Sequence, residues 1–235
     1  MKQKISKVAA AMLLTASLPV TAEMCSNFNP YVGADAQYRY MPFENDFGGN
    51  IFKKTSPQAN FFVGNRFNEY FGLELGYNTS KKVKRDVRLT SGQVVAGSAR
   101  PLPPTVFLDL HSTSKVSAFS TTAHGFLPIP DICGLDLIGS IGFARTKINL
   151  TYDRLADDVG PIPTNNRRRT FVAHKVITRL GAGIQYAILD NLSVRAFFNW
   201  ENTKRFQNLR AKEAPAAQLR LKNSVIYSLG LKYSF

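Results

Sequence analysis

The sequence predicts an all-β protein, an eight-stranded antiparallel up-and-down transmembrane β-barrel, from three observations. After the amino terminus there is no run of about 20 apolar residues, the length that a membrane-spanning helix needs. Eight segments instead alternate apolar and polar side chains with a period of two, which places each kind on its own face of a strand. The connections between these segments are alternately long and short, as in membrane barrels with turns at one end and loops at the other.

The amino terminus has the pattern of a cleavable secretory signal. Three lysines lie within the first seven residues, an apolar stretch runs from Val8 to Leu18, and Val20-Thr21-Ala22 is a small-residue cleavage site. We therefore expect residues 1–22 to be a signal peptide and residues 23–235 to form one barrel domain. Losing the three lysines lowers the formal net charge from +14 to +11, so the basic excess belongs to the mature protein.

The expected strands follow one another with little else between them. They are Tyr31–Tyr38, Pro57–Phe67, Tyr70–Thr79, Ser114–Phe126, Leu135–Leu150, Phe171–Ala187, Leu192–Glu201 and Val225–Phe235. The long connections are expected at 41–56, 80–113, 152–170 and 203–217, and short turns at 68–69, 128–134 and 190–191. The polar faces are rich in Gly, Ser and Asn, which are small enough to fill a narrow eight-stranded interior. A soluble lipocalin-like barrel, with its apolar face inward, is the alternative.

The last strand alternates up to the final residue. Tyr227, Leu229, Leu231, Tyr233 and Phe235 share one face. This pattern resembles the carboxyl-terminal signature of Gram-negative outer-membrane β-barrels. In those proteins the barrel-assembly machinery recognises the strand, so the resemblance implies that Tyr233 and Phe235 form an assembly signal. The edge strand of a soluble sandwich is the alternative for this stretch.

The resemblance extends over nearly the whole mature chain. The pattern is similar to that of the eight-stranded barrel families that include opacity-type surface antigens and the membrane domain of outer-membrane protein A. The resemblance implies a monomer in the Gram-negative outer membrane, surrounded by the lipid bilayer and lipopolysaccharide. No peptidoglycan-binding domain is expected, because the sequence ends with the barrel strand.

The polar, inward faces carry a few charges, among them Glu74, Arg179, Arg195, Glu201 and Lys232. Charges inside a barrel must pair or stay solvated. We expect Glu74 to pair with Arg179 or Arg195, and Glu201 to pair with a basic neighbour. The network is compatible with a small gated pore or with a polar plug, and an eight-stranded interior is only wide enough for side chains.

Basic clusters are concentrated in the long connections. They comprise Lys81, Lys82, Lys84, Arg85, Arg167, Arg168, Arg169, Lys204 and Arg205. Nucleic acid is excluded by the compartment, which leaves lipid A phosphates, acidic sugars or sulfated host glycans as anionic partners. Solvated loop charge without a partner is the alternative.

A catalytic or metal site has little support in the sequence. Ser112 and Ser114 flank His111, but no strand-anchored nucleophile signature accompanies them. No metal-ligand spacing or cofactor motif is present, so we expect neither. Cys25 and Cys133 would share the periplasmic side, where they either form a disulfide or remain two free thiols.

The sequence therefore predicts a non-enzymatic surface protein with an adhesin-like and envelope-stabilising role. A small pore for solute uptake is the second hypothesis, and a lipid A-modifying enzyme is the third.

Overall fold

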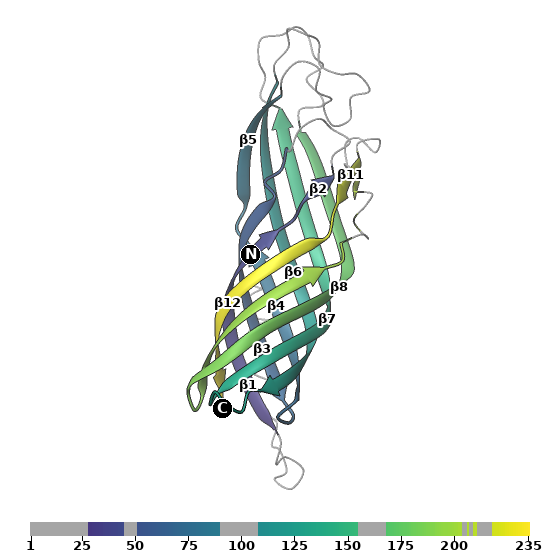
Figure 1. Cartoon of the computed structure of the whole chain (residues 1–235). Helices are drawn as coiled ribbons and strands as arrows, with labels where there is room; N and C mark the ends of the chain where they lie inside the picture. The colour runs from purple at the N-terminus through teal and green to yellow at the C-terminus, as the bar shows by residue number, and fades with distance from the viewer. Residues whose placement is uncertain are drawn as a thin grey trace, which may run out of the picture.

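The computed structural model shows an antiparallel barrel accompanied by a small second sheet (Figure 1). The described residues are 28–44, 51–89, 108–154, 168–203, 206, 209–210 and 218–235. The strands are β1 (Asn29–Tyr40), β2 (Phe43–Glu44), β3 (Thr55–Arg66), β4 (Phe71–Ser80), β5 (Val83–Leu89), β6 (Leu108–Pro128), β7 (Leu135–Arg154), β8 (Arg168–Leu189), β9 (Leu192–Glu201), β10 (Leu209–Arg210), β11 (Gln218–Leu221) and β12 (Ser224–Ser234). The described part of the chain contains no helix that is long and apolar enough to cross a membrane.

The barrel is closed by eight strand positions, with β4 and β5 sharing one of them. This confirms the predicted fold class. The hydrogen-bonded order is β4-β3-β1-β12-β9-β8-β7-β6-β5, and β4 also pairs with β6. β5 continues the line of β4 after an interruption at Lys81 and Lys82. The two strands therefore pair with successive parts of β6. The short connections 67–70, 129–134 and 190–191 lie at the same end as the carboxyl terminus (Figure 1). We call this end the turn end.

An outward-facing apolar band surrounds the half of the barrel nearest the turn end. Leu229 is 61% exposed and Ile141 is 60% exposed, although both are large apolar residues. Aromatic pairs border the band, with edge-to-face rings 5.5 Å apart for Phe198 and Tyr227 on the side away from the turn end, and 5.4 Å apart for Tyr233 and Phe235 near it. Such a band with aromatic borders is typical of a surface that faces lipid.

Three strands are much longer than the band requires. β6, β7 and β8 have 21, 20 and 22 residues, whereas about 9–11 residues cross a bilayer. On β7 the outward residues change from Ile141 and Phe143 to Arg145 and Lys147, while the inward residues become apolar from Ile148 onward. The prediction of a polar interior is therefore correct near the turn end and wrong beyond the band. Beyond the band the outer surface faces water instead of lipid, so the charged residues point outward and the apolar residues point inward.

The part beyond the band forms what we call the outer lobe: β5, the far halves of β6–β8, the small sheet β10-β11-β2 and residues 51–54. Figure 1 shows β2 and β11 beside the long strands. Phe52 contacts Phe43, Tyr152 and Phe171, with ring centroids 5.6–6.4 Å apart, and Phe206 is fully buried. The outer lobe therefore has a hydrophobic core of its own.

The outer lobe corrects all four long connections expected from the sequence, since segment 152–170 contains the end of β7 and the start of β8. Segment 41–56 supplies β2 and buried apolar residues, segment 80–113 contains β5 and the start of β6, and segment 203–217 supplies Phe206 and β10. The sequences of these segments resemble polar loops, because their apolar residues are separated by charged ones.

Candidate functional site

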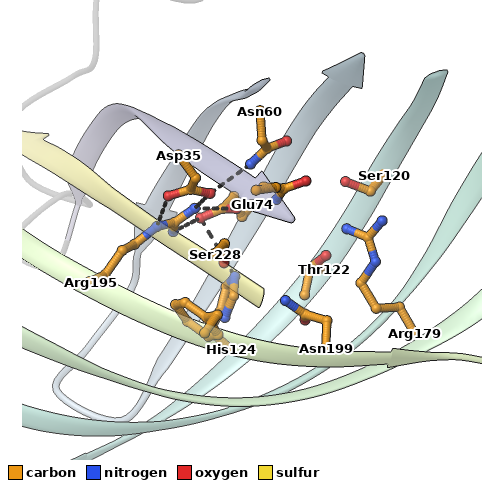
Figure 2. Close-up of a pocket in the computed structure, with 12 residues that line it drawn as sticks. Asp35, Asn60, Glu74, Ser120, Thr122, His124, Arg179, Arg195, Asn199 and Ser228 are labelled. Carbon is orange, nitrogen blue, oxygen red and sulfur yellow. Dashed lines mark hydrogen bonds and ion pairs between the residues drawn. The ribbon is translucent and has the colours of Figure 1, made fainter. Parts of the chain in front are cut away.

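The interior near the turn end is organised around Arg195 on β9 (Figure 2). Its guanidinium donates two hydrogen bonds of 2.8 Å to Asp35 on β1, and bonds of 2.6 and 3.3 Å to Glu74 on β4. Asn60 donates a further 2.8 Å bond to Asp35. All four side chains are buried, so one cation balances two carboxylates across the lumen.

Two aromatic rings accompany the Arg195 guanidinium. Its carbon lies 3.4 Å from the Phe62 ring centroid and 5.3 Å from that of Phe197, which are cation–π distances. Phe197 is the residue that breaks the polar alternation of its strand. His124 packs on Phe197 at 5.6 Å, and its Nε2 lies 3.6 Å from Glu74.

A second charged cluster lies nearer the outer lobe. Glu201 accepts hydrogen bonds from Arg39 at 2.8 Å, from Arg179 at 2.7 Å and from Ser224 at 2.7 Å. Glu201 and Arg39 are 0% exposed. Here two cations balance one carboxylate, which complements the excess of negative charge around Arg195.

The structure thus groups the expected interior residues as two pairs and a separate lysine. Glu74 pairs with Arg195, and Arg179 pairs with Glu201, whereas Lys232 lies apart and contacts the Tyr31 ring at 5.0 Å. The cavity beside the Arg195 cluster has a volume of about 20 Å³. This is room for about one water molecule and leaves no space for a hydrated solute.

Sequence reasoning missed three members of these clusters: Asp35, Arg39 and His124. Asp35 is on the polar face of the first expected strand, and its position was a usable signal. Arg39 lies one residue beyond the expected end of that strand. His124 lies in the Ser/Thr-rich strand, where the alternation is weakest.

The expected basic cluster residues occupy different environments. Lys81, Lys82 and Lys84 are exposed, whereas Arg85 is half-buried and donates to the Phe52 carbonyl at 3.4 Å. Arg168 is exposed and 3.7 Å from Asp153. Three further residues, Arg167, Lys204 and Arg205, lie outside the described residues.

Arg169 does not lie in a solvated loop as expected. It is the second residue of β8 and is only 4% exposed. The alternation of the strand turns its side chain inward, so the expectation of an anion-binding loop residue is wrong at this position.

A basic belt lies directly beyond the apolar band. We define it as Lys81, Lys82, Lys84, Lys115, Arg145 and Lys147, all of which are exposed. On β7 the belt begins at Arg145, two residues after outward-facing Phe143. On β6 outward-facing Phe119 is separated from Lys115 by a single outward position, Ser117. Cations are therefore concentrated at the border of the apolar band.

The candidate nucleophiles and their histidine point in opposite directions. His111 pairs with Asp86 on the outer surface of the lobe. Ser112 is buried and donates to the carbonyls of Ile51 at 2.7 Å and Arg85 at 2.9 Å, and Ser114 is also buried. These residues therefore form no nucleophile–base pair.

The described residues contain no cluster of three or more His, Cys, Asp or Glu that could hold a metal ion. Cys133 is an exposed free cysteine in the turn before β7. Cys25 lies outside the described residues, so the bond between the two cysteines stays a prediction.

A closed antiparallel barrel with an apolar, aromatic-bordered exterior and a polar interior defines a transmembrane β-barrel of the outer membrane. The sequence matches the outer membrane protein beta-barrel domain over residues 8–235, and the chain belongs to this family. The chain is accordingly an outer-membrane surface protein. By the architecture of this class, we assign the turn end to the periplasm and the outer lobe to the cell exterior.

Solved structures share the fold at low sequence identity. Neisserial surface protein A is 12% identical with a TM-score of 0.50, covering 88% of this chain and 97% of that one. A major outer membrane protein of Thermus thermophilus is 13% identical with a TM-score of 0.52, covering 88% and 99%. The attachment invasion locus protein Ail of Yersinia pestis is 12% identical with a TM-score of 0.48, covering 88% and 99%. No curated protein sequence matches the chain.

Proposed function

We propose that this chain is a non-conducting, non-catalytic surface protein that binds lipopolysaccharide phosphates through its basic belt. Its outer lobe would serve as an adhesin-like surface with affinity for anionic glycans. The observation that carries the proposal is the position of the belt, directly beyond the apolar band. At that height the phosphates of an outer-leaflet glycolipid would meet lysine and arginine side chains.

The register brings the belt residues of neighbouring strands together. Lys115 on β6 lies opposite Asn149 on β7, and Lys147 on β7 lies opposite Ser117 on β6 and exposed His174 on β8. The nearest cross-strand partners include no carboxylate, and Lys115 and Lys147 are exposed, so their head groups are accessible to anions.

Acidic residues of the same outer face have partners elsewhere. Asp109 pairs with Arg88 at 2.7 Å, Asp153 lies 3.7 Å from Arg168, and Asp86 pairs with His111. Within the described residues, no ion pair joins a carboxylate to a belt residue. This charge arrangement supports binding of an external anion.

The non-conducting part of the proposal is supported by the packed interior. The two charged clusters span the lumen, and the outer lobe places a hydrophobic core beyond them. The non-catalytic part is supported by the opposite orientations of His111 and Ser112.

The test is a triple variant, Lys115→Gln, Arg145→Gln and Lys147→Gln, measured for lipopolysaccharide binding in nanodiscs. At about 1 kcal/mol for each basic residue near an anionic surface, we expect affinity to fall roughly a hundredfold. The control is Arg88→Gln with Arg168→Gln, which removes cations that already have carboxylate partners. Equal binding by the triple variant and the wild type would refute the belt as the binding site.

Two further measurements separate the alternatives. Titration with a sulfated oligosaccharide tests the adhesin-like part, and no saturable binding would remove it. Stepwise conductance in a planar bilayer would instead support the pore hypothesis, and altered lipid A in cells that express the protein would support an enzyme.

A further inference from the structure

The periplasmic mouth of the barrel contains a cavity of about 380 Å³, far larger than the space beside Arg195. We call it the vestibule. Lys232 on β12, Ser193 on β9, Gln185 on β8 and Asp136 on β7 all line it. The strand register places them at similar heights: Lys232 lies opposite Ser193, and Asp136 lies opposite Gln185.

Lys232 differs from the other cations of this interior. Arg39, Arg66, Arg179 and Arg195 each bond to a carboxylate. Within the described part of the chain, no carboxylate forms an ion pair with the Lys232 ammonium, which lies 5.0 Å from the Tyr31 ring centroid, although the residue is just 4% exposed. The Lys232 ammonium lines the vestibule, so its hydrogen-bond acceptors come from the contents of that cavity.

The walls supply further donors beside Lys232. Ser193 is 7% exposed and Gln185 is 5% exposed, and both line the vestibule. Asp136 is already engaged, because Arg66 bonds to its two carboxylate oxygens at 2.7 and 3.5 Å. The inner wall therefore presents a cation, a hydroxyl and an amide without a free carboxylate of its own.

We propose that the vestibule binds a small periplasmic anion, with a carboxylate or phosphate group held by Lys232, Ser193 and Gln185. Glu69 and Asp190 line the same cavity and lie on exposed turns, so the entrance disfavours a polyanion. The ligand is therefore a small molecule with a single anionic group. This site faces the periplasm and is independent of the basic belt.

The test uses the whole protein in nanodiscs of zwitterionic lipid, followed by nuclear magnetic resonance of labelled backbone and side-chain amides. Acetate and inorganic phosphate are titrated separately against chloride at constant ionic strength. We expect saturable shifts at Gln185, Ser193 and Lys232 with at least one anion, and the comparison of the two separates carboxylate from phosphate preference. No saturable shift with either anion would overturn the proposal.

Variants then establish which group holds the anion. Lys232→Met should reduce affinity at least tenfold, and Ser193→Ala should reduce it severalfold without changing charge. Lys175→Met, at an exposed position of β8 outside both sites, is the matched control and should bind as the wild type does. Unchanged affinity in both Lys232→Met and Ser193→Ala would also overturn the proposal.

Discussion

Replacing Arg195 by Met should destabilise the barrel strongly, because Arg195 makes four hydrogen bonds to two buried carboxylates. Removing one partner of a buried ion pair costs about 3–5 kcal/mol. Here Asp35 and Glu74 lose their shared partner together. We therefore expect the free energy of unfolding to fall by about 5 kcal/mol, the upper end of that range.

The assay is urea unfolding of the purified barrel in detergent or lipid, followed by the shift in gel migration between folded and unfolded forms. The matched comparison is a neutral triple variant, Asp35→Asn, Glu74→Gln and Arg195→Met. It should recover most of the lost stability, because it leaves no unpaired charge at the positions of Asp35, Glu74 and Arg195. A loss below about 1 kcal/mol for the single variant, or a triple variant no more stable than it, would refute the reasoning.

The remaining predictions concern assembly, lipid contact, the outer lobe and the cysteines. Deleting Phe235 should leave the chain unassembled, and unchanged heat-modifiable migration would contradict this. Leu229→Arg should cost about 2–4 kcal/mol in urea unfolding, with no loss if the outward assignment is wrong. Phe171→Ala should cost about 3–5 kcal/mol locally and expose the outer lobe to protease while the barrel stays folded. Alkylation of Cys25 and Cys133 without prior reduction, read by mass spectrometry, would decide between a disulfide and two free thiols, because labelling of both excludes the disulfide.

The half of the barrel nearest the periplasm could be predicted because lipid restricts the outward residues there. Leu229 and Leu231 must be apolar whatever lies inside, so the faces of β12 follow from the sequence. The outer lobe was missed because its strands keep the same period of two while the apolar face moves inside. On β7 the signal is the change from Phe143 to Arg145 on the outward side, together with apolar inward residues from Ile148 onward.

The pairing inside the lumen could be predicted only as a set of possibilities. Glu74 had two candidate partners, Arg179 and Arg195, because the sequence does not say how far neighbouring strands slide past one another. The observed register and strand tilt bring Arg195 to Glu74 and Arg179 to Glu201. Arg39 was missed because strand ends are the least certain part of a pattern.

The separate core of the outer lobe also decides how much sequence change the connections beyond it can tolerate. From Arg145 to Arg154, β7 runs about 30 Å along the strand at ~3.3 Å per residue. The core around Phe52 fastens these strands together through residues of the outer lobe itself. Residues 90–107 and 155–167 could then diverge in sequence, or accept a grafted peptide, while barrel insertion continues unchanged. The connections would thus tolerate more sequence change than the membrane-embedded strands, in which the same rate of substitution would prevent folding.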